Sequence, residues 1–505
     1  IEWTARNEAS WNDLNNWSEK RIPQTNDIVA IESRKHKERA NVSLSNGDHT
    51  FKSLYLNGNL TFSNAHRSSD ENFQNITLSP GDFYLHDGRF KQYKNTTLNA
   101  DRIFASKRSD VRIFSGIVKN TEFNNESPIG FHPFQSCVVF CAPSLVEKLD
   151  TQLHDVTFNG HVDFAPDSEQ ILGNVGLTVF DGLTVNDKLV FSPVGEDFAR
   201  FGFWGEQKVS GSGEIILSMG QSSFDSYADN RLVLIPQVVD VDEALTFDRS
   251  VTIRGSGFIG VNTSKISGGH VAISGEVVAE MGDLILETID NSGDNLLLNP
   301  ISGDIWLSES LRNATLKYGS YAEDLDKIVN RIHLGDLDDG PGTPSSRPIK
   351  VTSIQAGVDL LTEQSLDIRD DFELNKTLTL QAGGSFRPRV SLTNITEITG
   401  RGVIQLLAPN EDAESRYQND LYDIRFSDLD KELSEVLTFG EDLKFIGTGR
   451  ISVESLLGKT DYLRILGSIT ASQGVLEIES LDNGDHPITL SHADGGIVYF
   501  EDAIK

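Results

Sequence analysis

The stretch Ile253-Arg-Gly-Ser-Gly-Phe-Ile-Gly-Val261 is one of four segments that share the pattern apolar-x-Gly-x-Gly-x-Ile-x-apolar. The other three are Val209–Leu217, Ile398–Leu406 and Phe445–Val453. The glycine pairs of the four segments are Gly211 with Gly213, Gly255 with Gly257, Gly400 with Gly402, and Gly447 with Gly449. A short strand, a glycine corner and another short strand, repeated without long helices between the copies, are typical of a chain that winds into a β-solenoid. The pattern therefore predicts an all-β fold, a parallel β-helix in which these glycines are structural corners.

Short alternating strands fill the sequence around these segments. Examples are Leu183-Thr-Val185, Leu245-Thr-Phe247 and Leu378-Thr-Leu380. Strands of this length cannot bury an apolar face alone, so neighbouring coils must cover one another, with inward side chains in columns about 4.8 Å apart. Two segments, 321–333 and 427–437, place apolar residues on one helical face and predict small helices that decorate the solenoid.

Tryptophans are concentrated at the start of the chain. Trp3, Trp11 and Trp17 are three of only five in the whole sequence. Such a cluster of large aromatic residues indicates an apolar surface that they cover. The first coil of a solenoid has such a surface, and solenoids need terminal caps. We therefore predict an N-terminal cap over residues 1–31; the alternative is an aromatic platform on which sugar rings stack.

Breaks in the strand rhythm suggest how the chain is divided. After the cap, a first β-helical section would span residues 32–150 and end in an irregular excursion at 121–150. A central section would follow over 151–335. The segment 336–348 reads DLDDGPGTPSSRP, which is typical of an exposed loop or linker, and a C-terminal β-helical section would span 349–505.

Composition and charge restrict the function. The chain has 505 residues, of which 38% are apolar, and a mean hydropathy of −0.27. Its 75 acidic and 44 basic residues give a formal net charge of −31, which disfavours nucleic acid and anionic lipid surfaces as partners. No apolar run of about 18 residues is present, so the sequence predicts no transmembrane segment. Met does not start the chain, and we interpret Ile1 as a processed or truncated end. Removal of a leader would make this an exported, extracellular protein.

Cys137 and Cys141 are the only two cysteines. They form a candidate disulfide in an oxidising compartment. On a flat strand their Cα atoms would lie roughly 13 Å apart, too far to bond, so a disulfide requires a local turn. Two buried thiols are the alternative. A zinc site with His132 lacks a second pair of ligands at suitable spacing.

Asn-x-Ser/Thr sequons are frequent and would be surface glycan acceptors in a secreted eukaryotic chain. A sequence rich in asparagine, serine and threonine also produces such triplets by chance. The sequons are Asn16, Asn41, Asn59, Asn75, Asn95, Asn262, Asn313, Asn375 and Asn394, together with Asn125, which is the least favourable because Pro128 follows its serine.

The opening of the chain resembles a known group of proteins. The residues that carry the resemblance are Trp3, Trp11, Asn16-Trp17, Pro23 and Asp27-Ile28-Val29, followed by the strand-Gly-x-Gly repeats. Together they are similar to the start of secreted β-helical surface proteins, notably bacterial autotransporter passengers and related adhesins. This resemblance implies a right-handed parallel β-helix outside the cell, used for attachment, matrix building or surface coating. It implies no common catalytic residues.

Enzymatic alternatives rest on acidic residues, because β-helical polysaccharide lyases and glycoside hydrolases need two carboxylates at one bond or a base beside calcium. The candidate pairs are Asp290 with Asp294, Asp338 with Asp339, Asp370 with Asp371, and Asp482 with Asp485. Such neighbours arise readily in an acidic chain, and adjacent residues of a strand point to opposite faces. Gly268-Gly269-His270 lacks the companion motifs of pectin-cleaving β-helices. We therefore predict no catalytic residues and no cofactor, with calcium at 290–295 or 482–485 left open.

These observations favour a non-catalytic structural or adhesive protein. We expect a β-helical rod that belongs to a cell-surface coat, sheath, appendage or adhesin and assembles end to end. Its expected partners are copies of itself, surface glycans and other cell-surface proteins, and not nucleic acid. A polysaccharide lyase or glycoside hydrolase and a glycan-binding module are the alternatives.

Overall fold

The computed structural model describes residues 1–5, 9–32, 41–44, 48–62, 76–93, 96–131, 151–164, 175–192, 199–218, 230–237, 241–261, 268–320, 331–334, 349–362, 366–381, 389–393, 397–407, 420–424, 436–454 and 462–501. Within these residues the protein is all-β, with 42 strands and one short 3₁₀-helix, η1 (Leu14–Asn16). The fold is a parallel β-helix, as the glycine repeats predict. The chain forms two compact units, Ile1–His270 and Val271–Lys505, which are described separately. No helix of the described part is long and apolar enough to cross a bilayer.

The strands of the first unit are β1 (Ala9–Ser10), β2 (Ile28–Glu32), β3 (Asn41–Leu44), β4 (His49–Asn57), β5 (Asn59–Phe62), β6 (Ile76–Leu85), β7 (Gly88–Gln92), β8 (Thr96–Leu98), β9 (Arg102–Ala105), β10 (Ser109–Ile113), β11 (Ile117–Asn125), β12 (Ile129–Phe131), β13 (Thr151–Phe158), β14 (Val162–Phe164), β15 (Val175–Val179), β16 (Leu183–Val185), β17 (Lys188–Phe191), β18 (Ala199–Trp204), β19 (Gln207–Ser210), β20 (Glu214–Leu217), β21 (Asn230–Ile235), β22 (Ala244–Phe247) and β23 (Thr252–Val261). Strand β24 (His270–Ile273) begins at His270, the last residue of the first unit.

The strands of the second unit are β25 (Glu276–Asp290), β26 (Asn295–Pro300), β27 (Ile305–Tyr318), β28 (Ile332–Leu334), β29 (Ile349–Ala356), β30 (Leu360–Thr362), β31 (Leu366–Leu374), β32 (Thr377–Gln381), β33 (Arg389–Thr393), β34 (Glu397–Thr399), β35 (Val403–Leu407), β36 (Asp420–Ile424), β37 (Val436–Phe439), β38 (Lys444–Glu454), β39 (Tyr462–Ile465), β40 (Ser468–Glu479), β41 (Thr489–Ala493) and β42 (Ile497–Glu501).

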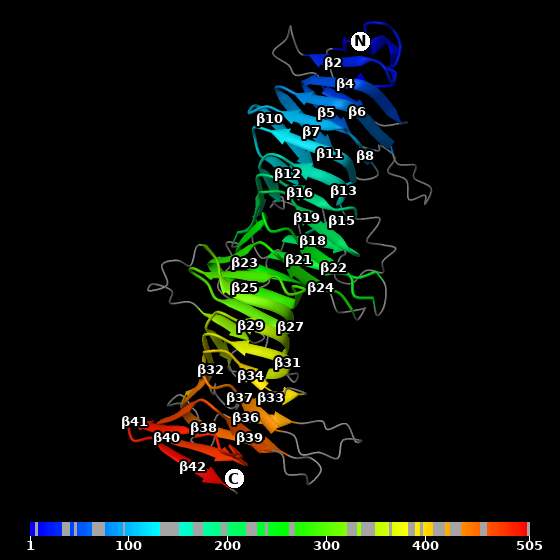
Figure 1. Ribbon diagram of the computed structural model, residues 1–505. Helices are drawn as coiled ribbons and strands as arrows, with labels where there is room; N and C mark the ends of the chain where they lie inside the picture. The colour runs from blue at the N-terminus through cyan, green and yellow to red at the C-terminus, as the bar shows by residue number, and fades with distance from the viewer. Residues whose placement is uncertain are drawn as a thin grey trace. The chain divides into compact units, whose positions relative to one another are not determined.

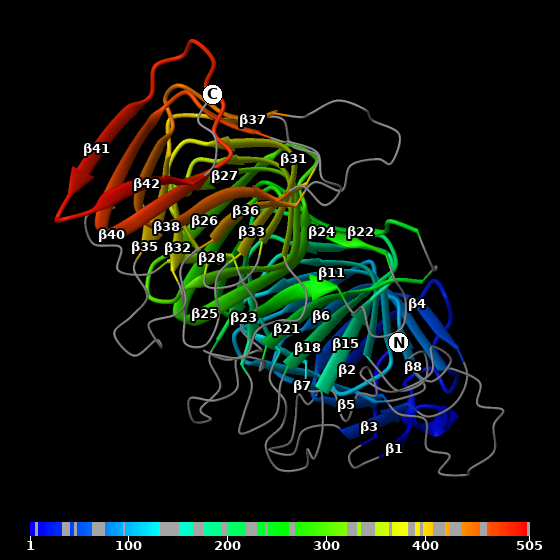
Figure 2. The ribbon, with the colours of Figure 1, turned by 90° about the horizontal axis from the view of Figure 1, so that it is seen from below.

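Each coil of the first unit has three sides, so its strands stack into three parallel ladders (Figure 1). One ladder runs β2, β4, β6, β9, β11, β13, β16, β19 and β22. Long strands such as β11 bend round a corner and join two ladders. The second unit repeats this plan from β27 onward, and its β38 and β40 also pair along two sides. Figure 2 shows the sides of the coils around their interior.

Side chains alternate between the interior and the surface, because successive residues of a strand point to opposite faces. In β10, Val111 and Ile113 are buried while Asp110 and Arg112 point outward. Parallel pairing in register then places inward residues of successive coils on top of one another. Phenylalanines fill much of the first unit's interior, and Phe123, Phe131, Phe158, Phe164, Phe191 and Phe201 are each at most 1% exposed.

The two predicted helical decorations are wrong at their described ends. Ile332 begins strand β28, and Val436 and Leu437 begin strand β37. Ile332 pairs with Ile305 of the preceding coil and is 1% exposed. Pairing with a neighbouring coil buries these residues and overrides the local helical pattern. The remaining residues of both segments lie outside the described part of the chain.

The predicted section boundaries at 150 and 336–348 also lie outside the described residues. Residues 121–131, which the sequence suggested are irregular, belong to β11 and β12 or the turn between them. The division at His270 falls within the section expected to span 151–335.

Candidate functional site

Trp3, Trp11 and Trp17 pack against one another at the start of the first unit. Trp17 lies edge-on to Trp3 and Trp11, with ring centroids 4.9 and 4.7 Å apart, and its Nε1 donates a 2.8 Å hydrogen bond to Trp11 O. The Trp11 ring stacks on Phe51 of β4 at 5.6 Å. The exposed fractions of the three tryptophans are 5%, 0% and 0%. This cluster covers the first coil as a cap and presents no tryptophan face for sugar stacking.

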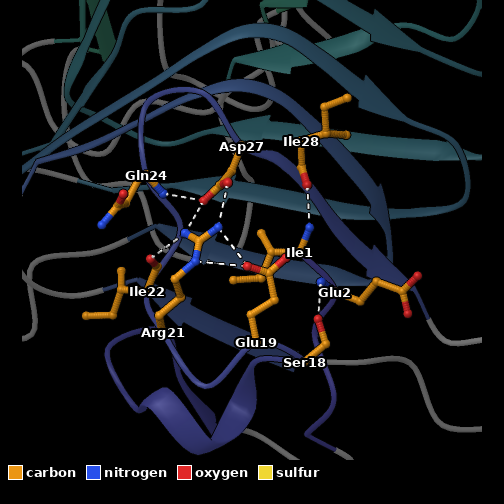
Figure 3. Close-up of polar contacts among 9 residues, drawn as sticks. All are labelled: Ile1, Glu2, Ser18, Glu19, Arg21, Ile22, Gln24, Asp27 and Ile28. Carbon is orange, nitrogen blue, oxygen red and sulfur yellow. Dashed lines mark hydrogen bonds and ion pairs between the residues drawn. The ribbon is translucent and has the colours of Figure 1, made fainter.

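An ion pair holds the segment that leads from the cap into β2 (Figure 3). Arg21 Nη1 and Nη2 lie 2.5 and 2.8 Å from the two carboxylate oxygens of Asp27, and Gln24 N donates a 2.7 Å hydrogen bond to Asp27 Oδ2. The Arg21 hydrogen bonds are the main cause that lowers the pKa of Asp27 to about 2. Because both carboxylate oxygens already bind protein donors, this network is structural.

The first glycine of each predicted corner has a left-handed backbone. The φ angles of these four glycines lie between 110° and 133°. A Cβ atom at Gly255 would lie 2.0 Å from Leu217 O, and one at Gly447 would lie 1.9 Å from Leu406 O. The backbone of the preceding coil occupies the space of a side chain, so these glycines set the packing of the coils. The four are Gly211, Gly255, Gly400 and Gly447.

The second glycines Gly213 and Gly402 differ from their partners. Each follows a bend between two strands, as predicted, but neither has a left-handed φ angle. A Cβ atom at Gly213 would lie 2.2 Å from Asp187 O, and one at Gly402 would lie 2.3 Å from Lys376 O. These two positions therefore require glycine because the preceding coil is close, and not because of their backbone conformation.

Gly257 and Gly449 lie where the chain changes its pairing partner, but without two separate strands on either side. Gly257 lies inside the continuous strand β23, and Gly449 lies inside the continuous strand β38, each together with the first glycine of its pair. Both strands pair with one strand before the glycines and with another after them. The chain thus turns from one side of the coil to the next within one assigned strand, a distinction that the shared sequence pattern does not contain.

Two buried asparagines make the same pair of hydrogen bonds in different parts of the second unit. Asn291 Oδ1 accepts a hydrogen bond from Ile273 N, and Asn291 Nδ2 donates one to Ile273 O, at 2.8 and 2.7 Å. Asn483 binds Ile465 N and O in the same way, at 2.9 and 2.8 Å. Each amide side chain therefore replaces the backbone of a paired strand.

The sequence around these asparagines is duplicated. Residues 244–298 align without a gap with residues 436–490. Matching hydrogen bonds at matching positions indicate that the chain contains an internal duplication. The identical pairs include Leu245 with Leu437, Thr246 with Thr438, Phe247 with Phe439, Gly255 with Gly447, Gly257 with Gly449, Ile259 with Ile451, Val261 with Val453, Ile273 with Ile465, Asp290 with Asp482, and Asn291 with Asn483.

A second block of the duplication precedes the first and pairs residues 182–217 with residues 371–406. In these blocks Asn186 Oδ1 and Asn375 Oδ1 accept hydrogen bonds of 3.3 and 3.4 Å from the middle residue of the next Gly-x-Gly corner. The four glycine repeats are therefore two equivalent pairs rather than four independent corners. The equivalence explains why Gly213 shares its setting with Gly402, and Gly257 shares its setting with Gly449.

An outward aromatic cluster of the first unit is a stack of Tyr55, Tyr84 and Phe104, here called the Tyr55 stack. These residues occupy paired positions on β4, β6 and β9. Their ring centroids are 4.6 and 4.9 Å apart and their planes differ by 10° and 9°. Tyr55 is 40% exposed. In-register pairing of three coils thus builds a column of stacked aromatic rings on the outside of the coils.

Charged groups border the Tyr55 stack. Arg102 Nε lies 2.9 Å from Asp82 Oδ1, and the Arg102 guanidinium lies 5.7 Å from the centroid of Phe104. The Tyr84 hydroxyl donates a 3.3 Å hydrogen bond to the same aspartate. Desolvation and the nearby Asp82 charge raise the pKa of Tyr84. The stack therefore combines aromatic rings with charged and polar groups at its edge.

The column continues below Phe104 as a row of asparagines. Asn159 Nδ2 donates a 3.0 Å hydrogen bond to Asn124 Oδ1, and Asn186 Nδ2 donates one of 2.7 Å to Asn159 Oδ1. One outward column of the first unit therefore changes from aromatic rings to amides along its length.

Two further outward columns contain histidine. His154, Phe180 and Trp204 stack with centroids 4.8 and 6.0 Å apart. In the second unit Trp306 stacks on His333 at 4.0 Å, and His333 Nε2 lies 3.0 Å from Asp304 Oδ2.

Two of the four acidic pairs predicted as alternatives, Asp290 with Asp294 and Asp482 with Asp485, lie within the described residues. Asp290 is 8% exposed and binds Ser292 N and Asn313 Nδ2, so its carboxylate is occupied by protein donors. Asp482 binds Gly484 N. Among the described residues, no group of three or more His, Cys, Asp or Glu could hold a metal ion. His270 Nδ1 lies 2.9 Å from Asp242 Oδ1. Asp338 and Asp339 fall outside the described residues, as do the side chains of Asp370 and Asp371.

Cys137 and Cys141 lie outside the described residues, as do the sequons Asn75, Asn95, Asn262 and Asn394 and the side chain of Asn41. Other sequon side chains already bind protein groups. Asn16 Nδ2 donates to Ser10 O, and Asn313 Nδ2 donates to Asp290. Asn375 is exposed; its Nδ2 donates to its neighbour Glu373 and its Oδ1 accepts from Arg401 N. Asn59 is half-buried.

Sequence reasoning did not find the Tyr55 stack. In the sequence, Tyr55 is the outward residue of the alternating triplet Leu54-Tyr55-Leu56. Its spacing to Tyr84 and from there to Phe104 is irregular, because the coils differ in length. The signal in the sequence that could have indicated the stack was an aromatic residue at an outward position of successive strands.

Comparisons of the chain with protein-family models, with curated proteins and with solved structures give no match.

Proposed function

We propose that this chain is a non-catalytic structural or adhesive protein of the cell surface, exported to the extracellular space. The observation that carries the proposal is the Tyr55 stack, an ordered aromatic surface on the outside of coils whose interior is filled with buried side chains. Because the described strands bury their inward side chains, their outward columns are available to partners. The resemblance of the opening residues to β-helical adhesins supports the same function.

Self-association is the second element of this proposal. Leu490, Ile497 and Tyr499 on β41 and β42 are 45%, 58% and 51% exposed. Leu490 corresponds in the duplication to Leu298, which is 0% exposed. Uncovered apolar side chains beside strand edges favour pairing with another coil. These features support an assembly in which copies of the chain meet at coil edges.

Adhesion is tested by retention of the purified chain on immobilised neutral and acidic polysaccharides and on fixed cells. We expect saturable retention without release of reducing sugar or unsaturated product. Turnover of any glycan in the panel would instead support a polysaccharide-active enzyme. Electron microscopy over a concentration series tests assembly, and single particles at every concentration would contradict it.

A further inference from the structure

Within the part of the chain that the structure describes, the Tyr55 stack ends at a step that no aromatic side chain occupies. Tyr55 pairs with Ala30 of β2 on the side opposite to Tyr84. Where a further aromatic ring would continue the stack, the chain therefore supplies only a methyl group. Glu2 pairs with Ala30 one step further on. Among the described residues, one face of the Tyr55 ring is thus left without an aromatic neighbour, which agrees with its 40% exposure.

The two outward columns that contain histidine and tryptophan differ from the Tyr55 stack. At both ends of each column, the paired residue has a larger side chain than alanine. His154 pairs with Lys119, and Trp204 at the far end pairs with Ile235. Trp306 pairs with Ile285, and His333 pairs with Leu361. A step occupied by alanine next to an exposed ring therefore distinguishes the Tyr55 stack from these two columns.

We propose that this step, bounded by Tyr55, Ala30 and Ile28, binds one pyranose ring of a neutral polysaccharide. The proposal rests on the adhesive function above and names its ligand class. Ile28 is 51% exposed and lies two residues before Ala30 on β2, so it forms an apolar side wall. Figure 3 shows Ile28 and Glu2 on the neighbouring segments.

The spacing suits a sugar. Rings in the stack lie 4.6 and 4.9 Å apart, close to the strand spacing of about 4.8 Å. A pyranose that lies on Tyr55 at this spacing would present its C–H face to the ring, and its hydroxyls would lie at the rim. The carboxylate of Glu2 can accept hydrogen bonds from those hydroxyls. A net charge of −31 disfavours anionic sugars, and a purely aromatic ligand would leave this polar rim unused.

The test uses the full chain and measures binding of cellohexaose, xylohexaose and mannohexaose by calorimetry and ligand-detected NMR. We expect saturable binding of at least one of them. Tyr55→Ala removes the platform and Ala30→Phe fills the step with a protein ring, and each should weaken binding at least about tenfold. Ala30→Phe should also keep or raise the midpoint of thermal unfolding, because it extends the stack. Phe180→Ala, in the other aromatic column, should leave binding unchanged.

Absence of saturable binding to all three sugars would overturn the proposal, and so would unchanged binding by the Ala30→Phe variant. Preferential binding of p-cresol with no sugar bound would also overturn it. Polysaccharide retention that persists in Ala30→Phe would overturn the sugar step while leaving the adhesive function intact, so the two failures are distinguishable.

Discussion

Asn291 binds the backbone of Ile273 through both atoms of its side-chain amide, at 2.8 and 2.7 Å. Asn291 is 3% exposed, so water cannot replace these bonds. The same relationship between Asn483 and Ile465 makes it a repeated element of this β-helix.

Replacement of Asn291 by alanine should destabilise the second unit by about 1–3 kcal/mol, because Ile273 N and O would be buried without partners. Asn483→Ala should have a similar cost. Chemical unfolding measured by circular dichroism tests this. Asn295→Ala is the control, because that side chain is exposed and should change stability by less than about 0.5 kcal/mol. Equal effects at Asn291 and Asn295 would contradict the assigned role.

Gly255→Ala and Gly447→Ala should each cost at least about 2 kcal/mol, because a Cβ atom would meet the carbonyl of the preceding coil. Gly293→Ala separates this clash from backbone strain. Gly293 has φ of 90° and no atom within 4 Å of a built Cβ, so only the cost of about 1–2 kcal/mol for a left-handed residue applies. Urea midpoints of the three variants give the comparison, and a larger loss at Gly293 would refute the steric explanation.

Trp17→Ala should cost about 3–5 kcal/mol, because it removes a fully buried aromatic ring from the cap. Exposure of the first coil should follow. Hydrogen exchange should accelerate first in β2 and β4, whereas strands of the second unit should keep their protection. Uniform acceleration throughout the chain would show that the cap acts on more than its own coil.

Stability should fall in acid partly through Asp27. Its pKa is about 2 in the folded chain against about 3.9 in an unfolded one. A lowered folded pKa means that the carboxylate stabilises the fold above about pH 4 and loses this contribution as the pH falls towards 2. The difference in thermal midpoint between the natural chain and Asp27→Asn should therefore shrink between pH 5 and pH 2. A constant difference over that range would contradict the ion pair's contribution.

The duplication predicts that the fold tolerates removal of one complete repeat, the distance between equivalent residues of the two copies. Deletion of residues 256–447 joins Gly255 to Thr448 and restores an apolar-x-Gly-x-Gly-x-Ile corner from two halves. The shortened chain should remain soluble, β-rich and cooperative in unfolding. Deletion of residues 256–448 is the matched control, because it removes one more residue and shifts the inward and outward faces beyond the join. Equal stability of both deletions would argue against equivalence of the two blocks.

Much of this architecture is local in origin, and the sequence predicts it. Gly-x-Gly corners between alternating strands predict a β-solenoid. Three tryptophans near one end of the chain predict a cap. The prediction of helical decorations was wrong at Ile332 and Val436 because apolar spacing that includes the start of a strand can imitate one helical face. Pairing with the preceding coil decides such cases, and no local pattern contains that information.

The Tyr55 stack and the asparagine row depend on pairing between coils of unequal length. Tyr55, Tyr84 and Phe104 meet because β4, β6 and β9 pair at particular residues, and the segments between them vary in length. The chemistry of the surface was therefore not readable from spacing along the chain.

The sequence by itself determined that this chain coils into strands with glycine corners and begins with an aromatic cap, since alternation, glycine and tryptophan act within a few residues. Only the tertiary structure decided which outward side chains share a column and that Ala30 leaves a step open beside Tyr55. That outcome follows from strand register, which is fixed by hydrogen bonds between coils distant in sequence.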